Sequence, residues 1–195
     1  MTDTPAPLFT VKRWVTASFL GWFAGAFAVI LTSSLFDAAG LEGFQFYLGI
    51  SIGGAIGYMQ WRLLRHSGIG MDWIWGACAG MGFPFLVNDI LNRFAVYSLG
   101  FWYLPVNIVA GALVVSVWHQ RILRTKFGAA VSWFPVSFVA WTVAPMLLPA
   151  SDSLRFLGAP NIITLIMNLS SIIGSGALLG LITGAKMRSI LTPQG

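Results

Sequence analysis

Few side chains in this sequence could perform acid–base or metal chemistry. The chain has two histidines, His66 and His119, and six carboxylates, of which Asp72 is near His66. With Arg62 and Arg65, these groups are all that could act on a lipid headgroup at one membrane surface, as a lipid-modifying enzyme would require. No HExxH spacing accompanies the histidines, so they are weak metal candidates and we expect them to be solvated or hydrogen-bonded to a helix end.

Nucleophilic chemistry has equally little support. The single cysteine, Cys78, lies in an apolar run, so the chain has neither a CxxC motif nor an internal disulfide. Ser175 stands between two glycines but lacks the GxSxG context of an esterase. We therefore expect no catalytic activity and no cofactor, and leave a bound lipid or pigment as the open alternative.

The elements that hold these residues are strongly apolar. The chain is 57% hydrophobic and only 9% charged, whereas soluble domains carry about 25% charged residues. Six apolar segments are each long enough to cross a hydrocarbon core as a helix, which takes about 20 residues. We predict an all-α integral membrane bundle, a single transmembrane domain over residues 1–195, with spans at residues 14–36, 44–64, 71–91, 101–123, 129–148 and 161–185.

The basic residues predict how the segments are oriented. Of the 11 lysines and arginines, only Arg93 and Arg155 fall in connections that would lie on the outer side. Positively charged connections stay in the cytoplasm, so both termini are predicted to be cytoplasmic. The net charge of +5 is thus a topology signal, and no nucleic-acid partner is expected. The residues on the inner side are Lys12, Arg13, Arg62, Arg65, Arg121, Arg124, Lys126, Lys186 and Arg188.

The chain also repeats itself with a period of about 59 residues. Odd segments open with Trp14, Trp73 and Trp133, and even segments carry two small residues four positions apart. We predict three tandem hairpins related by rotation about the membrane normal. Small residues let helices approach closely in lipid. We expect nine of them to mark helix contacts or a partner interface: Gly21, Gly53, Gly57, Gly80, Ala112, Ser116, Ala140, Gly176 and Gly180.

A more specific pattern lies in the second segment, which reads GGAIGYMQWRLLR over residues 53–65 and is followed by DWIW at 72–75. It resembles the GxxxGxxQWxxLR hairpin of uncharacterised multi-pass membrane proteins that are frequent in cyanobacteria and other bacteria. The likeness weakens over the next two segments, where WHQ at 118–120 replaces MQW at 59–61, and is faint in the last. The resemblance implies a multi-pass protein of a bacterial inner membrane or thylakoid, and no established activity.

Aromatic residues are abundant, and six of the nine tryptophans lie near the predicted cytoplasmic boundary. An interfacial belt with hydrated indole N–H groups is the expected arrangement for Trp14, Trp61, Trp73, Trp75, Trp118 and Trp133. Trp22 and Trp141 lie deeper and are predicted to make packing or ligand contacts. Four prolines are predicted to kink the helices: Pro84, Pro105, Pro135 and Pro145.

Polar residues at the other ends of the segments suggest a different use. Asp89 and Arg93 are spaced i,i+4, which can stabilise a helix end. A small-molecule carrier, resembling the substrate-binding components of vitamin transporters, would instead need an outward-facing pocket. The residues that would line it are Phe46, Tyr47, Asn88, Asp89, Tyr97, Tyr103, Asn107 and Asn168.

Short connections and the lack of a charged residue near any span centre favour a non-catalytic role. We expect a structural or assembly subunit of a larger membrane complex, such as a photosynthetic or electron-transport assembly. Its partners would be membrane lipids and other membrane subunits. The small-molecule carrier and the lipid-modifying enzyme stay as alternatives.

Overall fold

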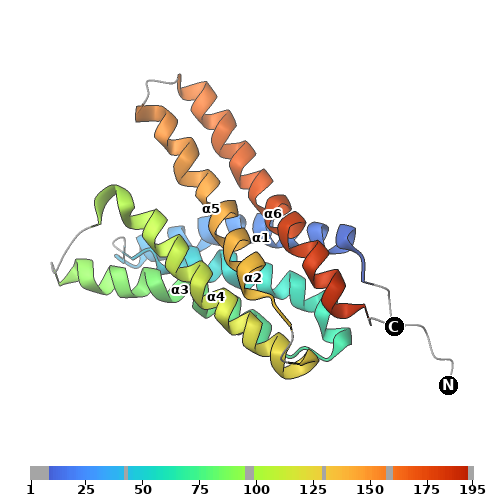
Figure 1. Ribbon diagram of the computed structural model, residues 1–195. Coiled ribbons are helices and arrows are strands. Elements are labelled where there is room, and N and C mark those ends of the chain that lie inside the picture. Colours follow the sequence, from blue (N-terminus) through green and yellow to red (C-terminus); the bar gives the residue numbers. More distant parts are fainter. Residues whose placement is uncertain (1–8, 42–43, 95–98, 129–130, 157–159, 193–195) are drawn as a thin grey trace.

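The computed structural model describes residues 9–41, 44–94, 99–128, 131–156 and 160–192. The described part is all-α (Figure 1) and consists of six α-helices and two short 3₁₀ turns. The helices are α1 (Val11–Ala38), α2 (Phe46–Leu64), α3 (Asp72–Arg93), α4 (Tyr103–Phe127), α5 (Phe134–Phe156) and α6 (Asn161–Leu191), and the turns are η1 (Arg65–Ser67) and η2 (Gly100–Trp102).

Each of the six helices predicted from hydropathy is found. Their ends differ most at the C-terminal side of α5 and α6, which continue beyond the predicted ends at residues 148 and 185 to Phe156 and Leu191. Helical hydrogen bonding is not confined to apolar residues, so helices can run past the apolar stretch. Pro105 and Pro135 lie in the first turns of α4 and α5, where a missing amide hydrogen would be unpaired anyway, so they interrupt no helix.

The six helices form a closed ring. Each packs against its neighbours in the sequence, and α6 packs against α1. Two clusters of buried residues fill the ring. The first draws on all six helices and includes Trp22, Ile56, Met81, Val115, Trp141 and Leu179. The second lies nearer the chain termini and includes Trp14, Leu64, Trp73, Leu123, Trp133 and Met187.

Small residues allow the ring to close. A Cβ atom added to Gly176 would lie 2.6 Å from the Trp22 Cβ, and one added to Gly180 would lie 2.7 Å from the Val15 Cα, so α6 rests directly on α1. At Gly174, by contrast, an added Cβ would meet nothing within 4 Å. All nine small residues singled out from the sequence repeat are buried.

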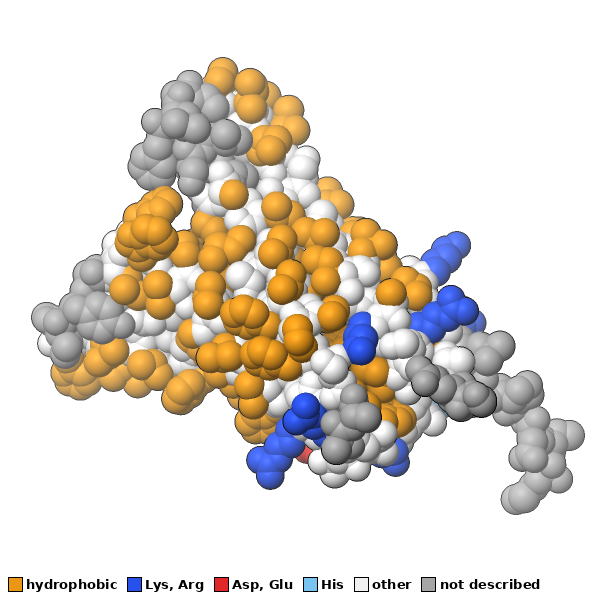
Figure 2. Space-filling view, in the orientation of Figure 1, with side chains coloured by type: hydrophobic (Ala, Val, Ile, Leu, Met, Phe, Trp, Pro, Cys, Tyr) orange, Lys and Arg blue, Asp and Glu red, His pale blue; other side chains and the backbone are white. Residues whose placement is uncertain are grey.

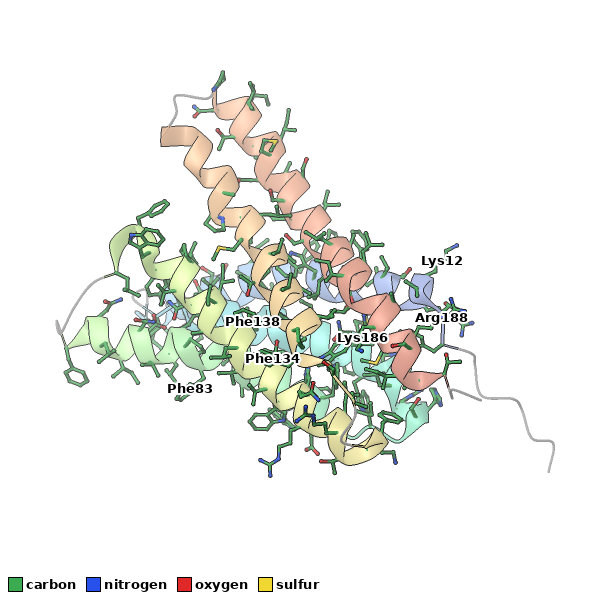
Figure 3. All side chains as sticks on the ribbon, viewed as in Figure 1. Lys12, Phe83, Phe134, Phe138, Lys186 and Arg188 are labelled. Atoms are coloured by element: carbon green, nitrogen blue, oxygen red, sulfur yellow. The ribbon has the colours of Figure 1, made fainter. Side chains whose placement is uncertain are left out.

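The two ends of the ring differ in charge and in packing. Lysines and arginines gather at the end where both termini lie, and the rest of the visible face is largely hydrophobic (Figure 2). We call this the basic end; Lys12, Lys186 and Arg188 lie there (Figure 3). At the other end the α3–α4 and α5–α6 hairpins diverge (Figure 1), and we call it the splayed end.

Four helices in the described part are long and apolar enough to cross a membrane. They are α1, α3, η2 together with α4 (Gly100–Phe127), and α6. In α5 the apolar stretch is shorter, Phe134–Ala150. In α2, Gln60 and Arg62 and several glycines lower the hydropathy. Apolar helices of this length indicate a membrane protein.

Candidate functional site

Three tryptophans meet inside the ring near the basic end. Trp14 belongs to α1, Trp73 to α3, and Trp133 directly precedes α5. Their ring centroids are 6.3 Å apart for Trp14 and Trp73, 6.5 Å for Trp14 and Trp133, and 6.0 Å for Trp73 and Trp133. Each is at most 1% exposed. We call this group the tryptophan triad.

The predicted interfacial belt is therefore wrong for these three residues. For Trp75 and Trp118, which are 63% and 43% exposed, the belt stays a prediction. Trp73 and Trp75 are two positions apart on one helix and so point to nearly opposite sides. The position of a tryptophan near the membrane boundary does not indicate whether its indole points into the ring of helices or away from it.

Polar side chains from neighbouring helices complete the triad. Trp73 donates its indole hydrogen to Gln60 Oε1 at 3.2 Å, and Trp14 donates its own to Thr183 Oγ1 at 2.8 Å. The Gln60 amide nitrogen donates in turn to Ser18 Oγ at 3.0 Å. This amide links α1, α2 and α3 where water is excluded, and there each satisfied hydrogen bond avoids the cost of an unpaired buried group.

His119 packs against the triad from α4. Its ring stacks on Trp73 with a centroid distance of 3.6 Å and an interplanar angle of 5°, and its Nε2 lies 2.9 Å from the Trp73 carbonyl oxygen. A carbonyl oxygen only accepts, so Nε2 carries the proton and donates it. Among the described residues, neither His119 Nδ1 nor Trp133 Nε1 has a hydrogen-bond partner.

His119 is thus a fully buried core residue and is not solvated; its hydrogen bond to Trp73, in the first turn of α3, agrees with the other expected arrangement, a bond to a helix end. His66 is exposed. Over the ranges that the structure describes, no three His, Cys, Asp or Glu residues lie close enough together to hold a metal ion.

Gln120, the next residue on α4, has a role that the sequence did not reveal. Its Oε1 accepts hydrogen bonds from the backbone amides of Trp133 at 2.5 Å and Phe134 at 2.8 Å, and its Nε2 donates to the Val131 carbonyl at 2.6 Å. The start of α5 is therefore held by a side chain of α4. A cap that comes from another helix leaves no local sequence signature.

A second polar group, at the splayed end, is built around Asp89 of α3. Its Oδ2 accepts from the backbone amides of Gln45 and Phe46, both at 2.7 Å, and its Oδ1 accepts from the Tyr103 hydroxyl at 2.6 Å. Asp89 is 4% exposed and so caps the N-terminus of α2 from inside the protein. A carboxylate suits the positive end of a helix. The expected pairing with Arg93 is replaced by these contacts.

The amides of Asn88 and Asn107 bind each other beside Asp89. Asn88 Nδ2 donates to Asn107 Oδ1 at 2.6 Å, and Asn107 Nδ2 donates to the Tyr103 carbonyl at 2.8 Å. Tyr47 instead donates its hydroxyl hydrogen to Ser33 Oγ of α1 at 3.2 Å.

The structure therefore brings together four of the eight residues proposed for an outer pocket, and links Phe46 to them through its backbone amide. Asn168 lies on α6, which packs on α1 and α5, whereas this cluster lies between α2, α3 and α4. Tyr97 lies outside the described residues. The four clustered side chains are Asn88, Asp89, Tyr103 and Asn107.

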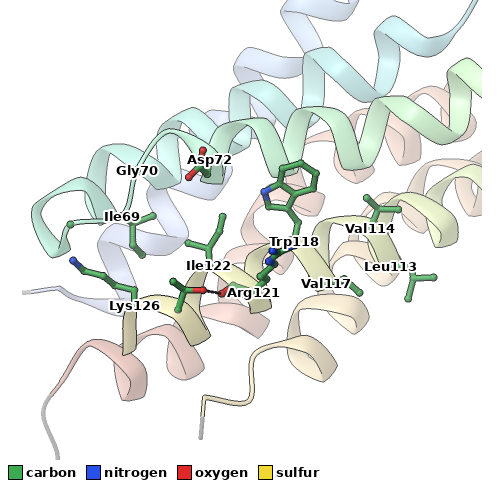
Figure 4. A pocket seen from close by; sticks show the side chains of 12 residues that line it. Ile69, Gly70, Asp72, Leu113, Val114, Val117, Trp118, Arg121, Ile122 and Lys126 are labelled. Carbon is green, nitrogen blue, oxygen red and sulfur yellow. Dashed lines mark hydrogen bonds between the residues drawn. The ribbon is translucent and has the colours of Figure 1, made fainter. Parts of the chain in front are cut away.

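Two grooves of similar size open at the basic end. The first, the α1–α2 groove, has a volume of about 700 Å³, and the second, the α3–α4 groove, about 710 Å³ (Figure 4). His66, Arg62 and Arg65 line the α1–α2 groove, whereas Asp72 lines the α3–α4 groove. The structure thus separates the carboxylate from the other groups that a lipid-modifying enzyme would need.

Comparison with known proteins adds no functional assignment. The chain matches no protein-family model, no curated protein and no solved structure. The fold and the sites thus define an all-α protein with apolar, membrane-type helices.

Proposed function

We propose that the protein is a non-catalytic, six-span subunit of a larger membrane complex. The observation that carries the proposal is the exposure of α6 at the splayed end. Between residues 161 and 173 only Thr164 and Ser171 are buried, while Ile162, Leu165 and Ile166 are 61%, 54% and 55% exposed. This half of α6 extends from the ring beside α5 (Figure 1), where helices of a partner subunit can cover it.

The buried polar residues support a structural role. The Gln60 amide bonds to Ser18 and Trp73, and the Asp89 carboxylate bonds to two backbone amides and to Tyr103. A carrier that used Asp89 and its neighbours to bind a ligand would have to break these bonds first. Each would cost about 1 kcal/mol or more, because the groups are buried.

The proposal includes three hairpins with both termini in the cytoplasm. Convergence of the three repeat-related tryptophans supports this arrangement. Gln60, His119 and Thr183 follow the second small residue of their helices by three positions, and each contacts a triad tryptophan. The collection of basic residues at one end supports the orientation (Figure 2).

Reporter fusions test the orientation. An alkaline phosphatase fused after Phe94 should be active, and a fluorescent protein fused after Gly128 should fold and fluoresce, because the two sites are expected on opposite sides of the membrane. Swapping the reporters between the two sites supplies the control. Activity of the same reporter at both sites would contradict six spans.

Site-specific photocrosslinking tests the partner surface. A photoreactive phenylalanine in place of Ile166 should form one discrete adduct with another membrane protein in native membranes. The same residue at Leu181, which lies on the basic half of α6 and is 59% exposed, should give lipid adducts only. A monomer after gentle detergent extraction, with no protein adduct at either position, would refute the subunit role. A saturable thermal shift with a small molecule would favour the carrier instead.

A further inference from the structure

The α1–α2 groove is lined both by apolar side chains, which we call its floor, and by basic side chains, which we call its rim. Leu20 of α1 and Met59 and Leu63 of α2 contribute the apolar side chains. The rim carries two pairs of cations, Lys12 and Arg13 from α1, and Arg62 from the end of α2 with Arg65 from the adjoining η1. All four cations are exposed, so their charges are available to a ligand.

No carboxylate is among the residues that line this groove within the described part of the chain. Four exposed cations without a neighbouring carboxylate create a positive potential that attracts an anion. Arginine side chains can bind phosphate oxygens with two parallel hydrogen bonds, so the three arginines of the groove suit a phosphate ligand.

We propose that the α1–α2 groove binds a phospholipid that carries two phosphodiester groups, as cardiolipin does. The basic rim would bind the phosphates and the apolar floor would contact acyl chains. Basic pockets between helices on the cytoplasmic side of a membrane bind headgroups of this type. Two phosphates match the two cation pairs better than one phosphate does, because a single phosphodiester would leave most of the rim charge uncompensated.

The α3–α4 groove provides an internal comparison. Arg121 and Lys126 line it, but so does Asp72, which lies on the first turn of α3 (Figure 4). In the sequence repeat, Asp72 occupies the position of Arg13, and Arg121 that of Arg62. The two grooves thus lie at equivalent positions of their hairpins and have nearly the same volume. The α3–α4 groove, however, has a carboxylate at the position where the α1–α2 groove has a guanidinium. The α3–α4 groove should therefore select a doubly charged lipid poorly.

Native mass spectrometry of the full chain tests the proposal. The protein is reconstituted in bilayers of phosphatidylethanolamine with equal minor fractions of phosphatidylglycerol and cardiolipin, and is then released with its retained lipids. The wild type should retain cardiolipin preferentially. Arg13→Asp should lower that retention at least about tenfold, because it removes a charge-assisted contact and adds a repulsive charge. Asp72→Arg should raise it by creating a second basic groove.

Lys186→Asp is the matched control, because it changes the net charge equally on a basic-end residue that does not line the groove. Its cardiolipin retention should stay at the wild-type level. Equal losses in Lys186→Asp and Arg13→Asp would overturn the groove as the cause, and preferential retention of phosphatidylglycerol would overturn the two-phosphate ligand. Insertion into bilayers without lipid preference would refute this inference alone, whereas failure to insert would refute the membrane proposal as well.

Discussion

Trp73→Ala is expected to lower the free energy of unfolding by about 4 kcal/mol, the largest loss for any single substitution considered. Trp73 is fully buried and contacts Trp14, Trp133 and the stacked ring of His119. Its removal would leave a cavity where helices from all three hairpins meet. It would also deprive Gln60 Oε1 of its indole donor.

Unfolding in mixed detergent micelles, followed by far-UV circular dichroism as the denaturing detergent is increased, measures this loss. Trp75→Ala is the control, because Trp75 lies two residues further along the same helix and is 63% exposed. Its substitution should cost about 1 kcal/mol or less. If Trp73→Ala and Trp75→Ala were equally mild, the triad would not be the centre of the packed ring.

Asp89→Ala should lower the free energy of unfolding by about 3 kcal/mol. The substitution removes both acceptor oxygens, and the amides of Gln45 and Phe46 and the Tyr103 hydroxyl then lose the partner that Asp89 provides. The N-terminus of α2 would fray as a result. The same detergent titration provides the measurement, and greater proteolysis near the start of α2 would localise the effect.

The control for Asp89 is the exposed carboxylate of Asp72, at the first position of α3. Asp72→Ala removes a favourable helix-end charge and should cost about 0.3–1 kcal/mol. Asp89→Asn keeps one acceptor oxygen and should fall between the two alanine variants. Equal effects of Asp89→Ala and Asp72→Ala would show that Asp89 does not cap α2.

Asp89 and Asp72 show why the role of an aspartate near a helix end can be predicted from the sequence in one case and not in the other. An aspartate in a first helical turn can be interpreted locally, because its benefit comes from its own helix. Asp89 lies near the C-terminal end of α3, where an aspartate is unfavourable for its own helix. It becomes stabilising only because α2 begins beside it. Spacing along α3 alone predicts Arg93 as its partner, and that spacing contains no information about α2.

The helices themselves are predictable from the sequence because apolar length and the spacing of small residues are properties of a short stretch of chain. Apolar length determines whether a segment can cross a bilayer. For this reason most of the predicted helix ends lie within a few residues of the observed ones. Gly176 and Gly180 were recognised as contact residues because small residues four positions apart lie on one face of any helix. Charge segregation to one end followed from the positions of the lysines and arginines.

Such properties of single segments do not predict which side chains point into the ring of helices and which point outward. Trp73 and Trp75 are the same residue type on the same helix turn. Trp73 is buried because α1, α2, α4 and Trp133 pack around it, whereas Trp75 is exposed. The cap of Gln120 on α5 and that of Asp89 on α2 likewise require two helices to be placed side by side. Composition and hydrophobic length are properties of each segment, whereas burial and hydrogen-bond partners arise between segments, and these depend on how the ring closes.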